Sequence, residues 1–170
     1  MNNMNNRLTQ PTPEVPEELE IQTSTLRLVA KCWGNPEGLP VLALHGWLDN
    51  AATFDHLAPF LPELRIVSLD LPGHGFSDHR PSGTSYHFTD MVVDVLEVAE
   101  VLKWDHFSLL GHSMGAGIAS YLAGTIPEKI KYLMLIEGLG SIVQAPEKMP
   151  ENLREATNQW LCRSDKKLPI

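Results

Sequence analysis

The stretch Gly111–Gly115, with the sequence Gly-His-Ser-Met-Gly, has residue types and a spacing that could do chemistry. It follows the apolar run Phe107–Leu110 and precedes small residues at helical spacing, so we expect a sharp strand-to-helix turn there. Such a turn holds the Ser113 hydroxyl above the edge of a sheet. We expect the amide N–H groups of Ser113 and Met114 to face a reacting carbonyl group. The stretch therefore predicts a nucleophilic serine.

The elements around this serine alternate between strand and helix. Two strands are predicted between Glu18 and Trp33, and the later elements come in strand–helix pairs. The predicted strands that follow are Val41–Leu44, Arg65–Leu69, His106–Leu110 and Ile130–Ile136, and the predicted helices are Ala51–Phe60, Tyr86–Lys103, Ser113 to about Gly124, and Glu151–Cys162, with a loop over Pro146–Pro150. This order is typical of the α/β class, with a mostly parallel sheet and helices on both faces. In such sheets, ligands bind at the carboxyl ends of the strands.

Composition limits the partners and the compartment that we expect. The formal net charge of −8 and the lack of a basic run argue against binding to nucleic acid. Cys32 and Cys162 lie too far apart in the sequence to form a disulfide framework or a metal site, so we expect a cytoplasmic protein. Residues 1–17, rich in Asn, Pro and Glu, predict a flexible arm without a secretory signal, and no apolar run approaches the ~20 residues that span a bilayer.

Three motifs together resemble the α/β-hydrolase family. They are His45-Gly46-Trp47 after one predicted strand, the glycine-punctuated loop Asp70–Ser77 after the next, and the stretch Gly111–Gly115 after the third. The string His45–Phe54 is most similar to serine hydrolase-like proteins and their bacterial relatives. The resemblance covers about residues 25–140.

The resemblance also implies roles for individual residues. Ser113 would be the nucleophile, and the N–H groups of Trp47 and Met114 would form the oxyanion hole. The remaining motif residues would support these loops; they are His45, Gly46, Gly111, His112 and Gly115. Residues 18–145 would form the N-terminal part of the hydrolase core, and residues 146–170 would begin a lid.

The catalytic histidine that the family carries after its last strand has no counterpart in this chain. The last histidine in the sequence is His112, which adjoins Ser113 and is expected to pack beneath the turn. The order Ser, acid, His cannot be completed here, so we expect a fragment or a truncated family member that lacks the C-terminal strands. Such a chain alone is not expected to be active, because no base removes the proton of Ser113.

The roles of the other polar residues near these motifs are either undecided between two alternatives or expected to be structural. Glu137 follows a predicted strand at the active-site edge, and it is either the triad acid or a group that acts at a lid hinge or supports the catalytic residues. His45, His74 and Asp70 are expected to hold loops by hydrogen bonding rather than to transfer protons. No histidine spacing matches a metal site, and no glycine-rich stretch matches a phosphate or dinucleotide site, so we expect no metal and no cofactor.

Two functional hypotheses follow from these motifs. The first is a serine hydrolase that forms an acyl-enzyme on Ser113 with a small, largely apolar carboxylic ester. The alternative is a truncated, non-catalytic protein that keeps the fold as a binding or interaction module. In both cases the strand Ile130–Ile136 would expose an apolar edge, which predicts self-association or poor solubility.

Overall fold

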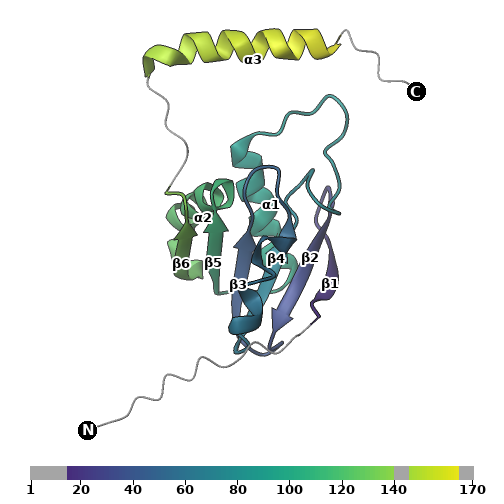
Figure 1. Ribbon diagram of the computed structural model, residues 1–170, viewed down its shortest axis with the longest axis vertical. Helices are drawn as coiled ribbons and strands as arrows, with labels where there is room; N and C mark the ends of the chain where they lie inside the picture. Colours follow the sequence, from purple (N-terminus) through teal and green to yellow (C-terminus); the bar gives the residue numbers. More distant parts are fainter. Residues whose placement is uncertain (1–14, 140–145, 165–170) are drawn as a thin grey trace.

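A six-stranded sheet, with the spatial order β1-β2-β4-β3-β5-β6, forms the centre of the molecule (Figure 1). The computed structural model describes residues 15–139 and 146–164. β2 runs antiparallel to both β1 and β4, whereas β4, β3, β5 and β6 are mutually parallel. The strands are β1 (Glu17–Gln22), β2 (Arg27–Gly34), β3 (Leu39–Leu44), β4 (Leu64–Leu69), β5 (Phe107–His112) and β6 (Ile130–Ile136).

Helices cover the two faces of this sheet unequally. α1 and α2 lie against each other on one face, and the opposite face is covered by the short 3₁₀ helices η1 and η2. The helices are η1 (Ala51–Phe54), η2 (Ala58–Phe60), α1 (Phe88–Val101), α2 (Met114–Thr125), η3 (Pro127–Lys129), η4 (Pro146–Lys148) and α3 (Met149–Ser164). The α/β class and the mostly parallel sheet are confirmed.

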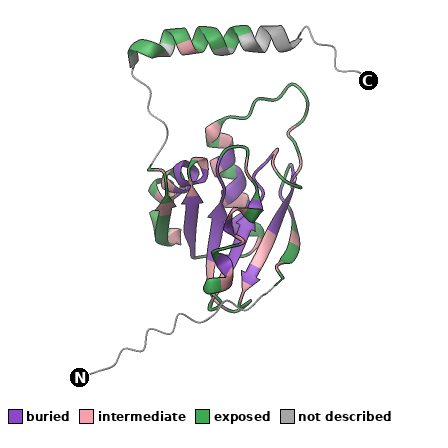
Figure 2. Ribbon diagram, viewed as in Figure 1, coloured by how far each residue is buried: buried purple, intermediate pink, exposed green. Residues whose placement is uncertain are grey.

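The side chains of β3 show how the sheet divides the core. Leu42 and Leu44 point toward α1 and α2, whereas Val41 and Ala43 belong to a second cluster that includes Phe54 of η1. Alternate residues of a strand point to opposite faces, and a strand buried on both faces is apolar throughout. Figure 2 shows this central strand and its neighbour β5 as almost entirely buried.

Two predicted elements are wrong. A single helix over Ala51–Phe60 does not form, because Pro59 has no N–H to continue a helical ladder and starts a separate 3₁₀ turn instead. The segment Pro146–Pro150 is not a loop, since η4 covers its first three residues and α3 begins at Met149. Proline is tolerated in the first turn of a helix, where its missing N–H would have no partner, so Pro150 does not delay the start of α3.

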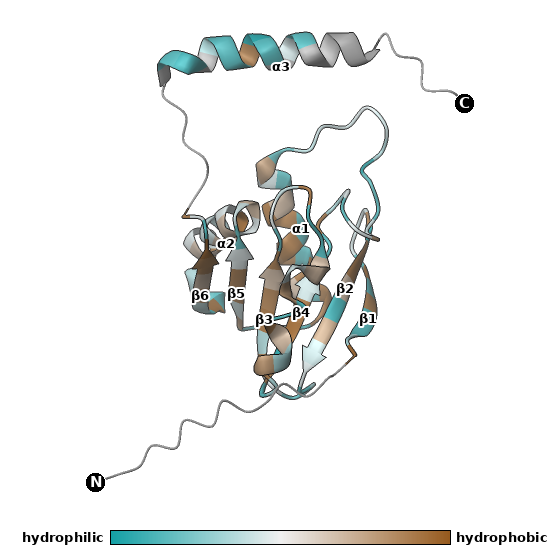
Figure 3. Ribbon diagram, viewed as in Figure 1, coloured by the Kyte–Doolittle hydropathy of each residue, from teal (hydrophilic) through white to brown (hydrophobic). Residues whose placement is uncertain are grey.

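β6 forms one edge of the sheet and remains exposed. Tyr132, Leu133, Met134 and Ile136 are each at least 40% exposed, and Figure 3 shows the hydrophobic character of this edge strand. An apolar strand with unpaired edge groups is a template for association. Among the described residues, no helix combines the length and apolar character needed to cross a bilayer.

Candidate active site

Ser113 occupies a strained corner between β5 and α2, which we call the elbow. Its backbone has φ of 50° and ψ of −110°, in the region that residues other than glycine rarely adopt. Such a conformation costs about 1–3 kcal/mol and persists only where the surroundings impose it. The Ser113 carbonyl accepts hydrogen bonds from the N–H groups of Ala116 (3.0 Å) and Gly117 (3.2 Å), which fix the corner to the first turn of α2.

The amide of Ser113 itself points into the sheet. Its N–H donates to the carbonyl oxygen of Ile136 in β6 at 2.9 Å, so the prediction that this N–H faces a reacting carbonyl is wrong. Met114 is the first residue of α2. The N–H groups of the first helical turn have no partner within the helix, so the Met114 N–H is a donor at the positive end of the helix dipole.

Backbones approach one another closely around this corner, as the two glycines of the motif predict. A methyl group on Gly115 would lie 2.1 Å from the carbonyl oxygen of Leu44, and one on Gly111 would lie 2.5 Å from the carbonyl oxygen of Gly115. Neither position has room for a side chain. The end of β3, the end of β5 and the start of α2 therefore meet through backbone atoms alone.

The loop after β3 passes directly beside the Ser113 side chain. A methyl group on Gly46 would lie 3.4 Å from the Cβ atom of Ser113 and 3.2 Å from Nδ1 of His112. The next residue, Trp47, is 62% exposed, and within residues 15–139 no carbonyl or side chain accepts a hydrogen bond from its N–H. Trp47 thus follows a glycine that lies beside the Ser113 side chain, and Met114 directly follows Ser113 at the start of α2.

His45 holds the loop after β3 to the loop after β4. Its Nδ1 lies 2.7 Å from the carbonyl oxygen of Gly46, and its Nε2 accepts a hydrogen bond from the Leu71 N–H at 3.0 Å. These two partners require a neutral ring with the proton on Nδ1. Burial lowers the pKa of His45 below its usual value of 6.5, which agrees with a neutral ring. The imidazole is fully buried and has no free nitrogen for proton transfer.

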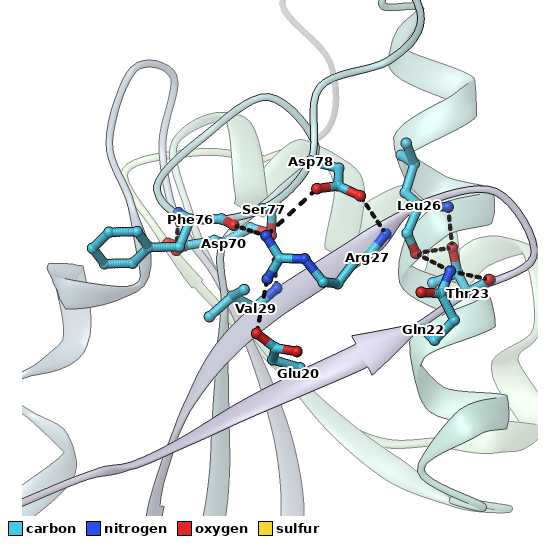
Figure 4. A network of polar contacts seen from close by, with 10 residues as sticks. All are labelled: Glu20, Gln22, Thr23, Leu26, Arg27, Val29, Asp70, Phe76, Ser77 and Asp78. Atoms are coloured by element: carbon cyan, nitrogen blue, oxygen red, sulfur yellow. Dashed lines mark hydrogen bonds and ion pairs between the residues drawn. The ribbon is translucent and has the colours of Figure 1, made fainter.

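Asp70 fixes the loop that follows β4. Its Oδ1 accepts from the Ala51 N–H at 2.6 Å, and its Oδ2 accepts from the Phe76 N–H at 2.8 Å. The Ser77 hydroxyl donates to the carbonyl oxygen of Asp70 at 2.6 Å and accepts from the Val29 N–H at 2.8 Å. Figure 4 shows Asp70, Phe76, Ser77 and Val29 beside the Arg27–Asp78 ion pair, which ties the same loop to β2. Asp70 therefore has a loop-holding role, as the sequence indicates.

His112 and Glu137 lie together at the ends of neighbouring strands. His112 Nε2 is 3.5 Å from Glu137 Oε2, and His112 Nδ1 is buried without a hydrogen-bond partner. The His112 side chain is 29% exposed, and its buried Nδ1 faces Gly46 of the loop after β3. The sequence analysis missed this pair, although parallel strands ending together would place the residues side by side.

Glu137 has an unusual backbone as well as an exposed carboxylate. Its φ is 51°, and its side chain is 80% exposed. The following residue, Gly138, approaches the elbow closely, since a methyl group there would lie 2.9 Å from the carbonyl oxygen of Ser113. The loop after β6 is thus fixed against the same corner. This position is compatible with either of the two roles that the sequence leaves open for Glu137.

His74 belongs to the wall of the site rather than to its centre. Its ring stands edge-on to the rings of His45 (5.0 Å between centroids) and Trp47 (5.8 Å), and Nδ1 lies 3.1 Å from the Pro72 carbonyl oxygen. Within the described part of the chain, no histidine lies in hydrogen-bond contact with the Ser113 hydroxyl, and no three His, Cys, Asp or Glu residues are grouped to hold a metal ion.

Comparison with known proteins identifies the family. The sequence profile of the alpha/beta hydrolase fold family matches residues 40–165. A serine hydrolase-like protein of Dictyostelium discoideum is 47% identical over 128 residues, which cover 73% of this chain and 36% of that protein. A human serine hydrolase-like protein is 40% identical over 126 residues, covering 74% of this chain and 62% of that protein.

Solved structures agree with these sequence relatives. A hypothetical protein from Pseudomonas aeruginosa PAO1 superposes with a TM-score of 0.83 at 49% identity, covering 94% of this chain and 56% of that one. The thioesterase domain from the curacin biosynthetic pathway gives a TM-score of 0.77 at 31% identity, covering 92% and 57% of the two chains. The chain spans 36% to 62% of the curated relatives named above. With the elbow at Ser113 and the match over residues 40–165, the chain belongs to the α/β-hydrolase family and resembles its serine hydrolase-like members.

Proposed function

We propose that Ser113 is the nucleophile of a serine hydrolase that acts on a carboxylic ester-like substrate. The observation that carries the proposal is the strained backbone of Ser113, with φ of 50°, at a corner between strand and helix. Backbone hydrogen bonds to Ile136, Ala116 and Gly117 hold this strained conformation, and such conformations cluster at functional positions. The hydroxyl would attack the substrate carbonyl, and the resulting acyl-enzyme would be released by water.

The oxyanion that forms in this attack would be bound by the N–H groups of Trp47 and Met114. Two features support this assignment: the closeness of Gly46 to the Ser113 side chain, and the position of Met114 as the first residue of α2. Amide donors fixed before the reaction stabilise developing charge without reorganisation, and one such donor contributes about 10²–10³ in kcat. His45 and Asp70 would act indirectly, since they hold the loop after β3, on which Trp47 lies.

The base of this mechanism would come from a segment C-terminal to the elements described here. His45 uses both ring nitrogens in backbone contacts, and His112 faces Glu137 and the loop after β3. Neither ring is placed to accept a proton from the Ser113 hydroxyl. Since the relatives are longer than this chain, we propose that the complete protein supplies the catalytic histidine and that these 170 residues alone are inactive.

Glu137 is proposed as a candidate for the triad acid, with a lid-hinge role as the alternative. Its carboxylate lies at the carboxyl end of β6, on the same edge of the sheet as Ser113. Changing Glu137 to Gln in the complete protein separates the two roles. If Glu137 is the triad acid, the substitution should lower kcat by several orders of magnitude. If Glu137 is a hinge group, the substitution should alter kcat by less than about tenfold.

The alternative function is a non-catalytic binding module. It is favoured by the lack of a base next to Ser113 within residues 15–139 and 146–164. Hydrolysis of 4-nitrophenyl esters by the complete protein, with a Ser113→Ala variant as the control, tests the two functions. We expect turnover that the substitution abolishes. Equal rates for the two proteins would leave the binding module as the function.

A further inference from the structure

A cleft of about 420 Å³ opens at Trp47, in the loop after β3. It lies between the loop after β3 and the segment that leads from β4 to α1. The lining residues that matter for the argument are Trp47, Pro72, Gly73, His74, His79 and Tyr86. Trp47 connects the cleft to the reaction centre, because it directly follows Gly46, whose backbone lies against Ser113.

One wall of the cleft is formed by the ring of Trp47. This ring packs edge-on against His74, which in turn packs against the buried ring of His45. The contacts hold one part of the indole, and the rest of it is exposed. An aromatic face held in place but left uncovered offers a large contact area at a low entropic cost.

A second wall of the cleft is formed by Tyr86, whose ring lies against Gly73. A methyl group on Gly73 would lie 2.8–3.0 Å from the Tyr86 hydroxyl and ring edge, so glycine is what lets the ring approach. The Tyr86 oxygen accepts a hydrogen bond from the Arg80 N–H at 2.8 Å and lies 3.3 Å from Nδ1 of His79. This wall is therefore fixed at the ring and at the hydroxyl.

Arg80 connects the Tyr86 wall to the core. Its guanidinium lies 5.7 Å from the Tyr86 ring centroid and donates to Asp94 of α1 at 2.5 Å. The two charged side chains are only 12% and 8% exposed. Because the charge of Arg80 is engaged by Asp94, it is not available to bind an anionic ligand in the cleft.

From these contacts we propose that the cleft is a substrate subsite for a neutral aromatic or alicyclic group, with Arg80 as a positioning residue for its Tyr86 wall. A flat ring placed between Trp47 and Tyr86 would contact both aromatic side chains and the apolar surface of Pro72. The formal net charge of −8 further disfavours an anionic group. The subsite rests on the proposed function, since its ring would belong to the substrate that Ser113 attacks.

Binding to the complete protein with the Ser113→Ala substitution tests the subsite without turnover. The probes are phenylacetamide and octanamide, two neutral amides with equal numbers of non-hydrogen atoms, and the readout is the fluorescence and the indole N–H resonance of Trp47. We expect phenylacetamide to bind about tenfold more tightly, because each aromatic contact adds about 0.5–1.5 kcal/mol. Equal affinities for the two amides would overturn the proposal.

Matched variants measure how much each of the two aromatic walls contributes to binding. Tyr86→Ala is expected to weaken phenylacetamide binding about tenfold, while Tyr86→Phe, which keeps the ring, should stay within about threefold of the parent. Trp47→Leu changes an exposed side chain and should weaken binding even if Tyr86→Ala fails to fold; its affinity is measured by titration calorimetry, because this variant lacks the Trp47 signals. Phe60→Leu, at an exposed ring of η2, is the control and should leave affinity unchanged. Full affinity in Trp47→Leu, or in a folded Tyr86→Ala variant, would overturn the proposal.

The positioning role of Arg80 has its own readout. Arg80→Met removes the charge and should weaken phenylacetamide binding, whereas Arg80→Lys keeps a partner for Asp94 and should restore most of it. If the role of Arg80 is purely structural, Arg80→Met should lower stability without this pattern of rescue in binding.

Labelling of wild-type Ser113 by a fluorophosphonate keeps the two proposals distinct. If Ser113 is labelled but phenylacetamide binds no better than octanamide, the subsite alone is overturned. If phenylacetamide binds better but Ser113 is not labelled, the hydrolase function is overturned.

Discussion

Gly46 and Ser113, from two different strand ends, lie so close that a methyl group on the glycine would stand 3.4 Å from the serine Cβ atom. This contact places the backbone that continues to Trp47 beside the hydroxyl of the elbow. An oxyanion hole requires donors that are fixed relative to the nucleophile, and this contact would fix the Trp47 N–H. His45 preserves the contact by tying the same loop to Leu71.

Enlarging Gly46 should therefore impair chemistry more than folding. In Gly46→Val, the side chain would push the loop away from Ser113, and we expect kcat of the complete protein to fall about 100-fold, the cost of a displacement near 1 Å. Gly124→Ala is the matched control, because a methyl group there meets no atom within 4 Å. A Gly46→Val enzyme with normal kcat would show that this loop supplies no donor.

Replacing His45 should destabilise the fold in a pH-dependent manner. His45→Ala leaves the buried Leu71 N–H without its acceptor, which costs about 1–3 kcal/mol at pH 7.5. The pKa of His45 is lowered in the folded state, so the unfolded chain binds the proton first as the pH falls through about 6.5. The wild type should therefore lose stability below pH 6.5, and the difference from His45→Ala should shrink. Urea unfolding at pH 7.5 and 5.5 measures this. A constant difference would contradict a neutral buried ring.

Asp94 should contribute a pH dependence of the opposite sign. Burial raises its pKa from 3.8 to about 6, against the opposing charge of Arg80 and with Glu97 and Asp90 of α1 adding to the rise. The folded carboxyl group takes up a proton before the unfolded one, so the cost of ionising Asp94 disappears as the pH falls from 6 toward 4.

The Asp94→Asn substitution isolates this effect, because Asn cannot ionise. The shift of 2.2 pKa units (6 − 3.8) corresponds to about 3 kcal/mol. We expect the unfolding free energy of Asp94→Asn to rise by about that amount relative to the wild type between pH 4 and pH 7. Parallel pH profiles for the two proteins would show that burial does not raise this pKa.

Many helices and strands can be predicted from the local sequence pattern, because a long periodic spacing of apolar residues usually matches the face that the element buries in the fold. The predicted helix Tyr86–Lys103 corresponds to α1, and the predicted strand Ile130–Ile136 has the bounds of β6. The failure at Ala51–Phe60 has a local cause in Pro59, which the apolar spacing alone does not reveal.

The candidate site was less accessible from the sequence than the fold. The glycines of the elbow identify Ser113, but the direction of its N–H depends on the pairing of β5 with β6, in which His112 lies opposite Ile136. That register would have predicted the contact between His112 and Glu137. The Arg80–Asp94 pair joins a loop to a helix, and the spacing of residues in the sequence does not predict such a contact.

The exposed edge of β6 predicts self-association of the 170-residue chain. Its apolar residues, Tyr132 at 66% exposure among them, have no cover within the described residues. We expect the chain to form dimers or larger species in sedimentation velocity, and Met134→Lys to shift it toward monomer. Val93→Lys, at an exposed valine of α1, is the control and should change nothing. A monodisperse wild-type monomer at micromolar concentration would refute the prediction.

Covalent labelling of Ser113 by a fluorophosphonate in the complete protein tests the central claim most directly. Intact-mass analysis and peptide mapping should show one adduct, located on Ser113 and absent in Ser113→Ala. The same probe should label the 170-residue chain far more slowly, because His45 and His112 are not placed to act as its base. A complete protein that stays unlabelled at Ser113, or is labelled at another serine, would contradict the account.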